Sequence, residues 1–108
     1  MDRDLSDLGR YAEPSLLILV SLSGGPKHGY AIMDDSETLG RRRIGAGTLY
    51  AALARLERLG LIEPLPPDGS RRRPYRLTGL GAATLKAQLK GMRTLADTGL
   101  GRLDEALG

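Results

Sequence analysis

Residues 47 to 62, Gly-Thr-Leu-Tyr-Ala-Ala-Leu-Ala-Arg-Leu-Glu-Arg-Leu-Gly-Leu-Ile, constrain the fold of this 108-residue chain more than any other stretch. Leu49, Leu53 and Leu56 recur at the spacing that lines one face of an α-helix, and Ala52 extends that face. Glycine is the residue that most readily adopts the left-handed conformation found at helix ends, so we expect Gly60 to end the helix. The sequence therefore predicts a short amphipathic helix with a defined end.

The outer surface of this helix is small, hydroxylated and cationic, and it carries Thr48, Ala51, Arg55 and Arg58. Arginine triplets stand on both sides of it, at 41–43 and 71–73. Residues 41–76 carry a net charge of +6, whereas the rest of the chain carries −3. A localised positive field of this kind attracts nucleic acid or another polyanion.

The segment after this helix has the pattern of a two-stranded hairpin. Residues 61–65 read as a strand that Pro66 and Pro67 cut short, and residues 73–77 read as its partner. Asp68-Gly69 is a turn signal, and Pro74 requires that its strand lie on an edge. A hairpin tipped by arginines directly after a basic helix is the wing of a winged-helix domain.

Two further helices precede the basic helix. Pro14 suits the first position of a helix, and the residues up to about Ser23 are almost all apolar, which predicts a core helix. Gly24-Gly25-Pro26 breaks the chain. We expect the second helix at 28–39, ended by Gly40. Its inner side consists of Ile32, Met33 and either Ser36 or Leu39.

The last helix is expected to begin after Thr78, as its cap, and to run from 79 to about 97. Its apolar residues recur at 4-3-4 spacing, which is typical of a helix that packs lengthwise on another helix. A compact winged helix is expected to close its core before residue 80, so this apolar stripe predicts a homodimer; the alternative is packing against the first helix. The expected dimerisation residues are Leu85, Leu89, Met92, Ala96 and Leu103. The sequence leaves open whether residues 98–108 continue the helix.

The fold class is therefore mainly α with a small β-hairpin (α+β), a winged helix-turn-helix with a C-terminal dimerisation helix. We expect an N-terminal arm or short helix at 1–13, the DNA-binding domain at 14–78 and the dimerisation helix at 79–108.

The sequence offers no catalytic or cofactor chemistry. It has no cysteine, and its one histidine, His28, cannot form a metal site alone. We find no acid pair, glycine-rich phosphate loop or nucleophile motif, so we predict no enzyme, no cofactor and no metal. The apolar run 16–20 is too short to span a bilayer and the N-terminus does not resemble a signal peptide, so a cytoplasmic protein without a membrane partner is expected.

Four motifs resemble the PadR-like family of transcriptional regulators: Pro-Lys-His-Gly-Tyr at 26–30, Gly-Thr-Leu-Tyr at 47–50, the segment 53–62, and Arg-Arg-Arg-x-Tyr-Arg-Leu-Thr-x-x-Gly at 71–81. The resemblance covers residues 14–97. In its length and its single C-terminal helix, the chain is similar to the short subclass of the family. It implies a homodimeric winged-helix repressor whose third helix enters the DNA major groove, and a response to a small hydrophobic effector. The chain departs from the family at Ala51, where proline is usual, and in lacking the tryptophans that clamp flat ligands in some short members.

The expected function is that of a sequence-specific DNA-binding regulator, a homodimeric repressor on a palindromic operator. Thr48, Ala51 and Arg55 would approach base edges, with Arg55 able to contact guanine through two hydrogen bonds. The arginine triplets would bind phosphates, although some of residues 41–43 could instead pair with acids of the second helix. The complete set of predicted DNA-binding residues is Arg41, Arg42, Arg43, Thr48, Tyr50, Ala51, Arg55, Arg71, Arg72, Arg73 and Tyr75.

Several alternatives stay open at this stage. The Tyr50 hydroxyl could bind phosphate, or the side chain could serve packing only. His28-Gly29-Tyr30 reads as a structural helix start in which Tyr30 fills a core edge. An effector pocket would be lined by residues such as Leu16, Met92 and Leu95. The alternative function is that of an interaction adaptor whose basic face meets an acidic partner protein.

Overall fold

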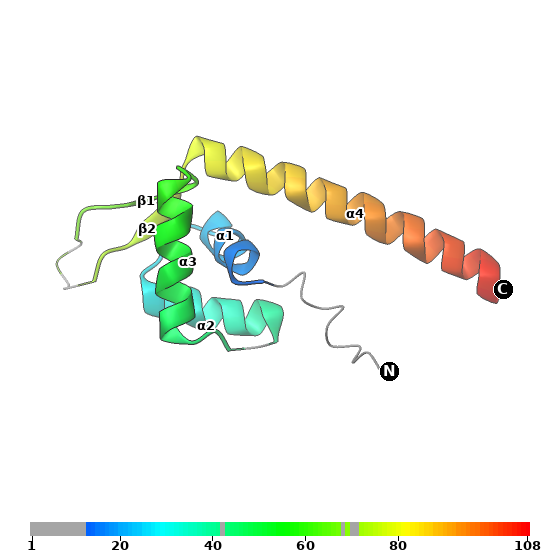
Figure 1. The fold of residues 1–108 in the computed structure, drawn as a ribbon, viewed down its shortest axis with the longest axis horizontal. Coiled ribbons are helices and arrows are strands. Elements are labelled where there is room, and N and C mark those ends of the chain that lie inside the picture. The colour runs from blue at the N-terminus through cyan, green and yellow to red at the C-terminus, as the bar shows by residue number, and fades with distance from the viewer. Residues whose placement is uncertain (1–12, 42, 68, 70–71) are drawn as a thin grey trace.

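The computed structural model describes residues 13–41, 43–67, 69 and 72–108, and this part of the chain holds four helices and one two-stranded hairpin (Figure 1). The elements are α1 (Pro14–Ser23), α2 (Gly29–Gly40), α3 (Ala46–Arg58), β1 (Ile62–Pro64), β2 (Tyr75–Leu77) and α4 (Gly79–Leu107). The predicted order of elements is confirmed. Residues 1–12, which we predicted to form an arm or short helix, lie outside the described residues.

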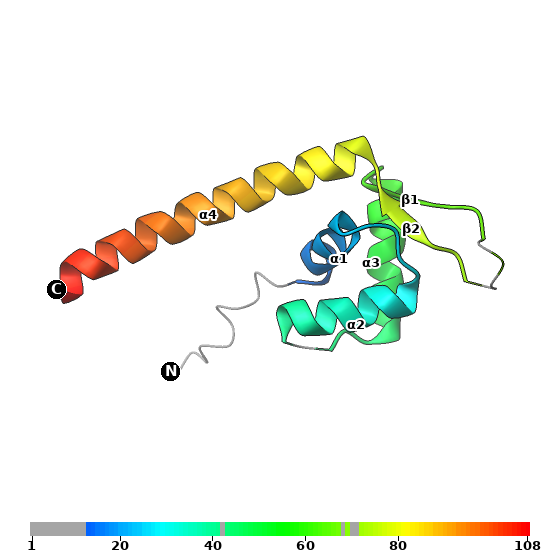
Figure 2. The same ribbon diagram turned by 180° about the vertical axis from the view of Figure 1, so that it is seen from behind.

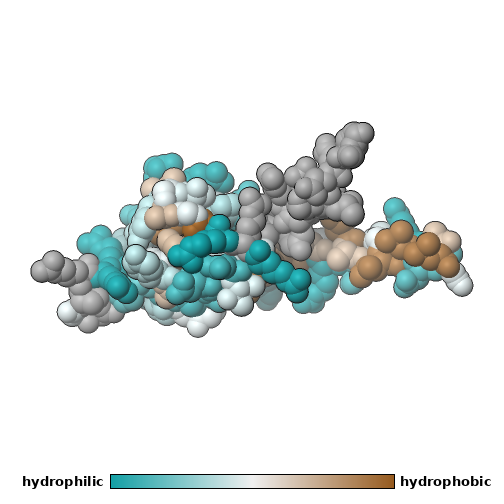
Figure 3. Space-filling model, turned by 90° about the horizontal axis from the view of Figure 1, so that it is seen from below, coloured by the Kyte–Doolittle hydropathy of each residue, from teal (hydrophilic) through white to brown (hydrophobic). Residues whose placement is uncertain are grey.

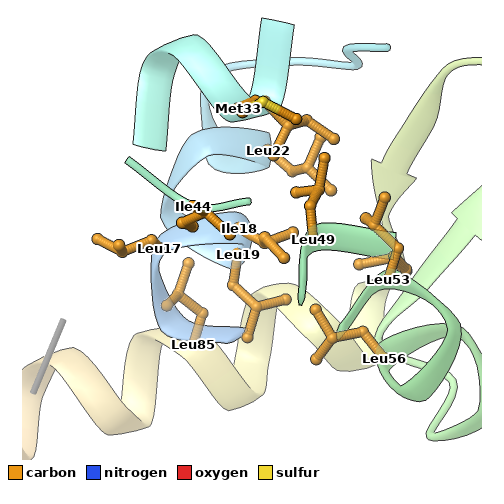
Figure 4. Packing of buried hydrophobic residues seen from close by; sticks show 12 residues of the cluster. Leu17, Ile18, Leu19, Leu22, Met33, Ile44, Leu49, Leu53, Leu56 and Leu85 are labelled. Atoms are coloured by element: carbon orange, nitrogen blue, oxygen red, sulfur yellow. The ribbon is translucent and has the colours of Figure 1, made fainter. Parts of the chain in front are cut away.

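The core forms where α2, α3 and α4 all meet α1. Ile18 of α1 is completely buried, and Leu49, Leu53 and Leu56 of α3 are at most 2% exposed. Figure 4 shows their side chains meeting those of α1, with Met33 of α2 above them. The repeat of apolar residues along α3 thus has its expected consequence, because the three leucines are buried in the centre of the domain and Ala52 packs against them, partly buried.

The end of α2 differs from the prediction in its detail. The helix includes Gly40, and the following Arg41 adopts the left-handed conformation, with a φ of 56°. Gly40 also packs closely against α1: a Cβ atom there would lie 2.7 Å from the Leu17 Cδ1 atom, so a larger residue would require the Leu17 side chain to shift. On the inner side of α2, Ser36 is fully buried, whereas Leu39 is 47% exposed.

The hairpin is shorter than predicted and has a second neighbour. Ile62 pairs with Leu77 and Pro64 with Tyr75 in antiparallel register. On the other edge of β2, Tyr75 and Lys27 exchange backbone hydrogen bonds of 2.9 and 3.1 Å. Pro74 lies just before the strand, so its missing N–H costs the ladder nothing. The wing is therefore attached to the loop between α1 and α2 as well as to α3.

Helix α4 starts as predicted and extends further than predicted. The Thr78 side chain accepts a hydrogen bond of 2.9 Å from the Gly81 backbone N–H, and Gly81 packs so closely that a Cβ atom would lie 1.9 Å from the Leu61 carbonyl oxygen. The helix continues without interruption for 29 residues. Figures 1 and 2 show its C-terminal half projecting away from the other helices.

The core does not close before residue 80, which corrects that expectation. Leu85 is 4% exposed and belongs to the same cluster as the buried side chains of α1 and α3. At Leu85, therefore, the last helix packs against α1, which is the alternative to a subunit interface that the sequence left open. No helix within the described residues is long and apolar enough to cross a membrane.

Candidate nucleic-acid interface

The exposed side of α3 carries most of the predicted base-reading residues. Successive residues of a helix are rotated by about 100°, so Gly47, Ala51, Ala54 and Arg58 lie opposite the buried leucines. Thr48 and Arg55 lie beside them on the flank that faces the start of α1, where they border a shallow depression of about 290 Å³. All six are exposed. The centre of the outer surface is thus made of small residues, with arginines at its C-terminal end.

Arg58 belongs to this surface, although our set of DNA-binding residues omits it. The signal was present in the sequence, because Arg58 lies three residues after Arg55 and seven after Ala51, on the same side of a helix. Arg55, Arg58 and Arg73 form no ion pair within the described part of the chain, so their charges are available to an anion.

A cleft of about 260 Å³ lies where the N-terminus of α2, the helix α3 and the wing meet. We call it the tyrosine cleft; it is lined by Gly29, Tyr30, Tyr50, Arg72, Arg73 and Tyr75. Gly29 allows this approach, because a Cβ atom there would lie 2.5 Å from the Tyr50 hydroxyl oxygen. Four predicted DNA-binding residues from two separate elements therefore lie around one cavity.

Tyr30 lies in this cleft and not at a core edge, which corrects our interpretation of the His-Gly-Tyr motif. Its side chain is 58% exposed, and the guanidinium carbon of Arg72 lies 5.1 Å from the centre of its ring. This is the geometry of a cation–π interaction. His28 occupies the N-cap position of α2, but its side chain makes no capping hydrogen bond there.

The electrostatic surroundings of Tyr75 keep its hydroxyl neutral. Burial raises the pKa of Tyr75 above its ordinary value of 10.0, and the charges of Glu57 and Tyr50 raise it further, while Arg73 acts in the opposite direction. A neutral phenol retains its proton and can donate a hydrogen bond to an anion. Tyr75 thus adds a donor next to the arginines of the wing.

The arginines of the two triplets have different surroundings. Arg43 donates a hydrogen bond of 2.7 Å to a Glu37 carboxylate oxygen of α2, so the alternative of pairing within the protein is realised for this residue. Arg41 is exposed at the end of α2. Arg42 and Arg71 lie outside the described residues. A further pair at 2.7 Å joins Arg76 to Glu63 across the hairpin.

A second cavity, away from the tyrosine cleft, lies in the region where we expected an effector pocket. A cavity of about 420 Å³ lies between α1, α3 and α4, and Leu16 and Met92 both line it. Leu95, which is 74% exposed on α4, does not line this cavity. Arg55 borders this cavity as well as the outer surface of α3.

The apolar residues of α4 fall into a buried and an exposed group. Leu85 is enclosed in the core, whereas Leu89 and Leu103 are 40% and 55% exposed, and Leu100 and Leu107 are exposed too. Figure 3 shows apolar atoms gathered over the C-terminal end of this helix. Met92 is half-buried and Ala96 is exposed. Among the described residues, no three His, Asp or Glu side chains lie close enough to hold a metal ion.

Comparison with known proteins gives the family. Residues 18–87 match the transcriptional regulator PadR-like family. An uncharacterised 37.1 kDa protein in transposon TN4556 of Streptomyces fradiae is 41% identical over 87 residues, which are 81% of this chain and 25% of that protein. The chain thus spans a quarter of the length of that relative.

Solved structures of transcriptional regulators are similar to this chain in fold. A transcriptional regulator from Clostridium thermocellum is 27% identical, with a TM-score of 0.70 over 91% of this chain and 94% of the other. A PadR family regulator from Clostridium difficile is 26% identical, with a TM-score of 0.69 over 88% and 98%. One from Eggerthella lenta is 32% identical, with a TM-score of 0.67 over 91% and 88%. Family members are transcriptional regulators and not enzymes, and this chain, with its winged helix and long C-terminal helix, belongs to the PadR-like family.

Proposed function

We propose that this chain is a sequence-specific DNA-binding repressor that acts as a homodimer on a palindromic operator. The observation that carries the proposal is the tyrosine cleft, because it places α3 and the arginines of the wing side by side on one basic surface. A recognition helix and a wing must lie together in this way to bind adjacent parts of one duplex.

In this proposal α3 enters the major groove. Gly47, Ala51 and Ala54 have little or no side chain, so the helix backbone can approach the base pairs closely. Thr48 and Arg55 then reach base edges from one flank, and Arg55 can donate two hydrogen bonds to guanine. Arg58 lies near the end of α3 and would contact the phosphate backbone.

Phosphate contacts supply most of the affinity. Arg72, Arg73, Tyr50 and Tyr75 all line a cleft large enough for a phosphate group. Charged and hydroxyl donors of this kind fix the register of a protein on DNA without reading sequence. The exposed apolar stripe of α4 supports the homodimer, and the cavity beside Leu16 and Met92 supports control by a small apolar effector.

One observation favours a second candidate function. Tyr30 and Tyr50 are 58% and 50% exposed, and exposed tyrosines flanked by arginines are common at the energetic centre of protein–protein interfaces. A basic tyrosine-rich surface could therefore bind an acidic protein. The small outer surface of α3 is the feature that favours DNA instead, since it lacks the bulky side chains that anchor a protein partner.

The test is a titration of DNA from the upstream region of the gene against a random duplex at several salt concentrations. Replacing Arg71, Arg72 and Arg73 with alanine is expected to weaken binding to every sequence and to lower the salt slope by about one for each phosphate that is no longer neutralised. Arg55→Ala is expected to relax preference at one base position, by about 1–3 kcal/mol. Arg102→Ala, which removes a charge from the far end of α4, serves as the control.

Wild-type binding by both variants would contradict these roles. Equal and weak binding of wild type to both duplexes, together with capture of an acidic protein domain, would favour the second candidate.

A further inference from the structure

The shallow depression on the flank of α3 differs in character from the tyrosine cleft. It has a volume of about 290 Å³, and its lining residues come from α3 and from the start of α1. Three of them, Pro14, Ala51 and Ala52, have side chains made of carbon alone. The depression therefore offers apolar surface within a face that is otherwise basic.

The charges around this depression make it a weaker phosphate site than the tyrosine cleft. Arg55 and Arg58 border it on the α3 side, but Glu13 borders it on the α1 side. Glu13 is exposed, makes no capping hydrogen bond to α1 and forms no ion pair within the described part of the chain. Its carboxylate offsets one of the two arginine charges and repels phosphate oxygens. An uncharged base edge fits this position better than the DNA backbone does.

Gly47 indicates that a partner approaches this side of α3 closely. A Cβ atom at Gly47 would meet no atom of the described chain within 4 Å, and the residue has no positive φ. Neither packing nor backbone conformation within the subunit thus requires glycine there, although glycine destabilises a helix relative to alanine. Close approach of the α3 backbone to a bound molecule accounts for its lack of a side chain. Ala51 lies one helical turn further along the same exposed side.

We propose that Ala51 recognises a thymine, whose 5-methyl group packs against the Ala51 Cβ atom in this depression. The inference rests on the DNA-binding function proposed above and assigns one base of each operator half-site. Thymine is distinguished on its major-groove edge by this methyl group, and small apolar side chains such as alanine are among the groups that recognise it. Arg55 lies one helical turn after Ala51 and borders the same depression, so this thymine and the guanine contacted by Arg55 belong to one half-site.

Uracil substitution isolates the proposed contact, because uracil differs from thymine only in lacking the 5-methyl group. The duplex for this test is the tightest-binding sequence selected from a random pool, and each symmetry-related pair of its thymines is replaced in turn. Removing one buried methyl group is expected to weaken binding about four-fold, so one thymine pair is expected to weaken it about fifteen-fold. The measurement is a titration of labelled duplex by fluorescence anisotropy at fixed salt.

Two glycine variants test whether Ala51 makes this contact. Ala51→Gly is expected to bind the thymine and uracil duplexes equally, because it has no Cβ atom to meet the methyl group. Ala54→Gly is the matched control, since Ala54 is exposed on the same helix but does not line the depression. Both changes lower helix propensity alike, and a general loss of affinity cancels when the two duplexes are compared for each variant. Ala54→Gly is expected to keep the fifteen-fold loss caused by uracil.

The possible failures are distinguishable. A wild-type chain that prefers no selected duplex over random DNA would overturn the proposed function, and this inference with it. Specific binding that no uracil substitution weakens would overturn the thymine contact alone. A uracil effect that Ala51→Gly retains, or that Ala54→Gly abolishes, would show that Ala51 does not recognise the thymine.

Discussion

Replacing Gly81 with alanine tests how firmly α4 is fixed to the rest of the domain. A Cβ atom at Gly81 would lie 1.9 Å from the carbonyl oxygen of Leu61 and 2.8 Å from its carbonyl carbon. Ordinary carbon–oxygen contacts are about 3.3–3.6 Å, so the two backbone segments must separate by more than an ångström. The obstacle is backbone and cannot rotate away.

The cost can be worked out from what this separation breaks. The same Leu61 carbonyl accepts a 3.1 Å hydrogen bond from the Thr78 N–H, and its loss costs about 0.5–1.5 kcal/mol. Forced expansion of a packed contact adds about 1–3 kcal/mol. Together these give an expected decrease of about 1.5–4.5 kcal/mol in the free energy of unfolding for Gly81→Ala.

The assay is urea unfolding followed by circular dichroism, with Gly91→Ala as the matched control. Gly91 lies in the same helix, is exposed, and a Cβ atom there would meet no other atom within 4 Å. This control is expected to raise stability by about 0.5–1 kcal/mol, because alanine favours helix more than glycine does. Equal stability of the two variants would refute the close contact between Gly81 and Leu61.

Three further predictions concern the tyrosine cleft and the end of α2. Tyr30→Leu is expected to weaken DNA binding several-fold by removing the ring under Arg72, whereas Tyr30→Phe keeps the ring and is expected to bind as wild type does; binding titrations that show equal losses for both would contradict the cation–π role. The pKa of Tyr75 is higher in the folded chain than in the unfolded one, so its contribution to stability is present below about pH 10 and is lost as the pH rises through the folded pKa. In unfolding experiments between pH 9 and 12, Tyr75→Phe should therefore lose less free energy of unfolding than the wild type as the pH rises. Arg41→Gly is expected to raise the free energy of unfolding by about 0.5–1 kcal/mol, because the residue has a φ of 56°, and a decrease in thermal melting experiments would argue against left-handed strain there.

The features that the sequence predicted correctly are those that depend on residues close together in the chain. The spacing of Leu49, Leu53 and Leu56 was enough to place the buried side of α3, and Gly60 has the positive φ, 77°, expected at its end. Thr78 caps α4 as predicted because a cap requires only the residues next to it.

Features that depend on contacts between distant segments were not predicted. Gly40 was assigned a role in ending α2, but its small size serves packing against Leu17, which the sequence does not place nearby. Leu85 was assigned to a subunit interface because nothing in its spacing shows that α1 lies beneath it. Tyr30 was assigned to a core edge because the approach of the wing is not encoded within the His-Gly-Tyr motif.

The tyrosine cleft also gives the protein a natural optical probe. The chain has no tryptophan and four tyrosines, of which Tyr30, Tyr50 and Tyr75 all line this one cleft. Intrinsic fluorescence therefore arises from tyrosine alone, and most of its emitting groups lie at the junction of α2, α3 and the wing. A change at this junction can be followed by quenching or anisotropy in the unmodified protein, without a label that would disturb the basic surface.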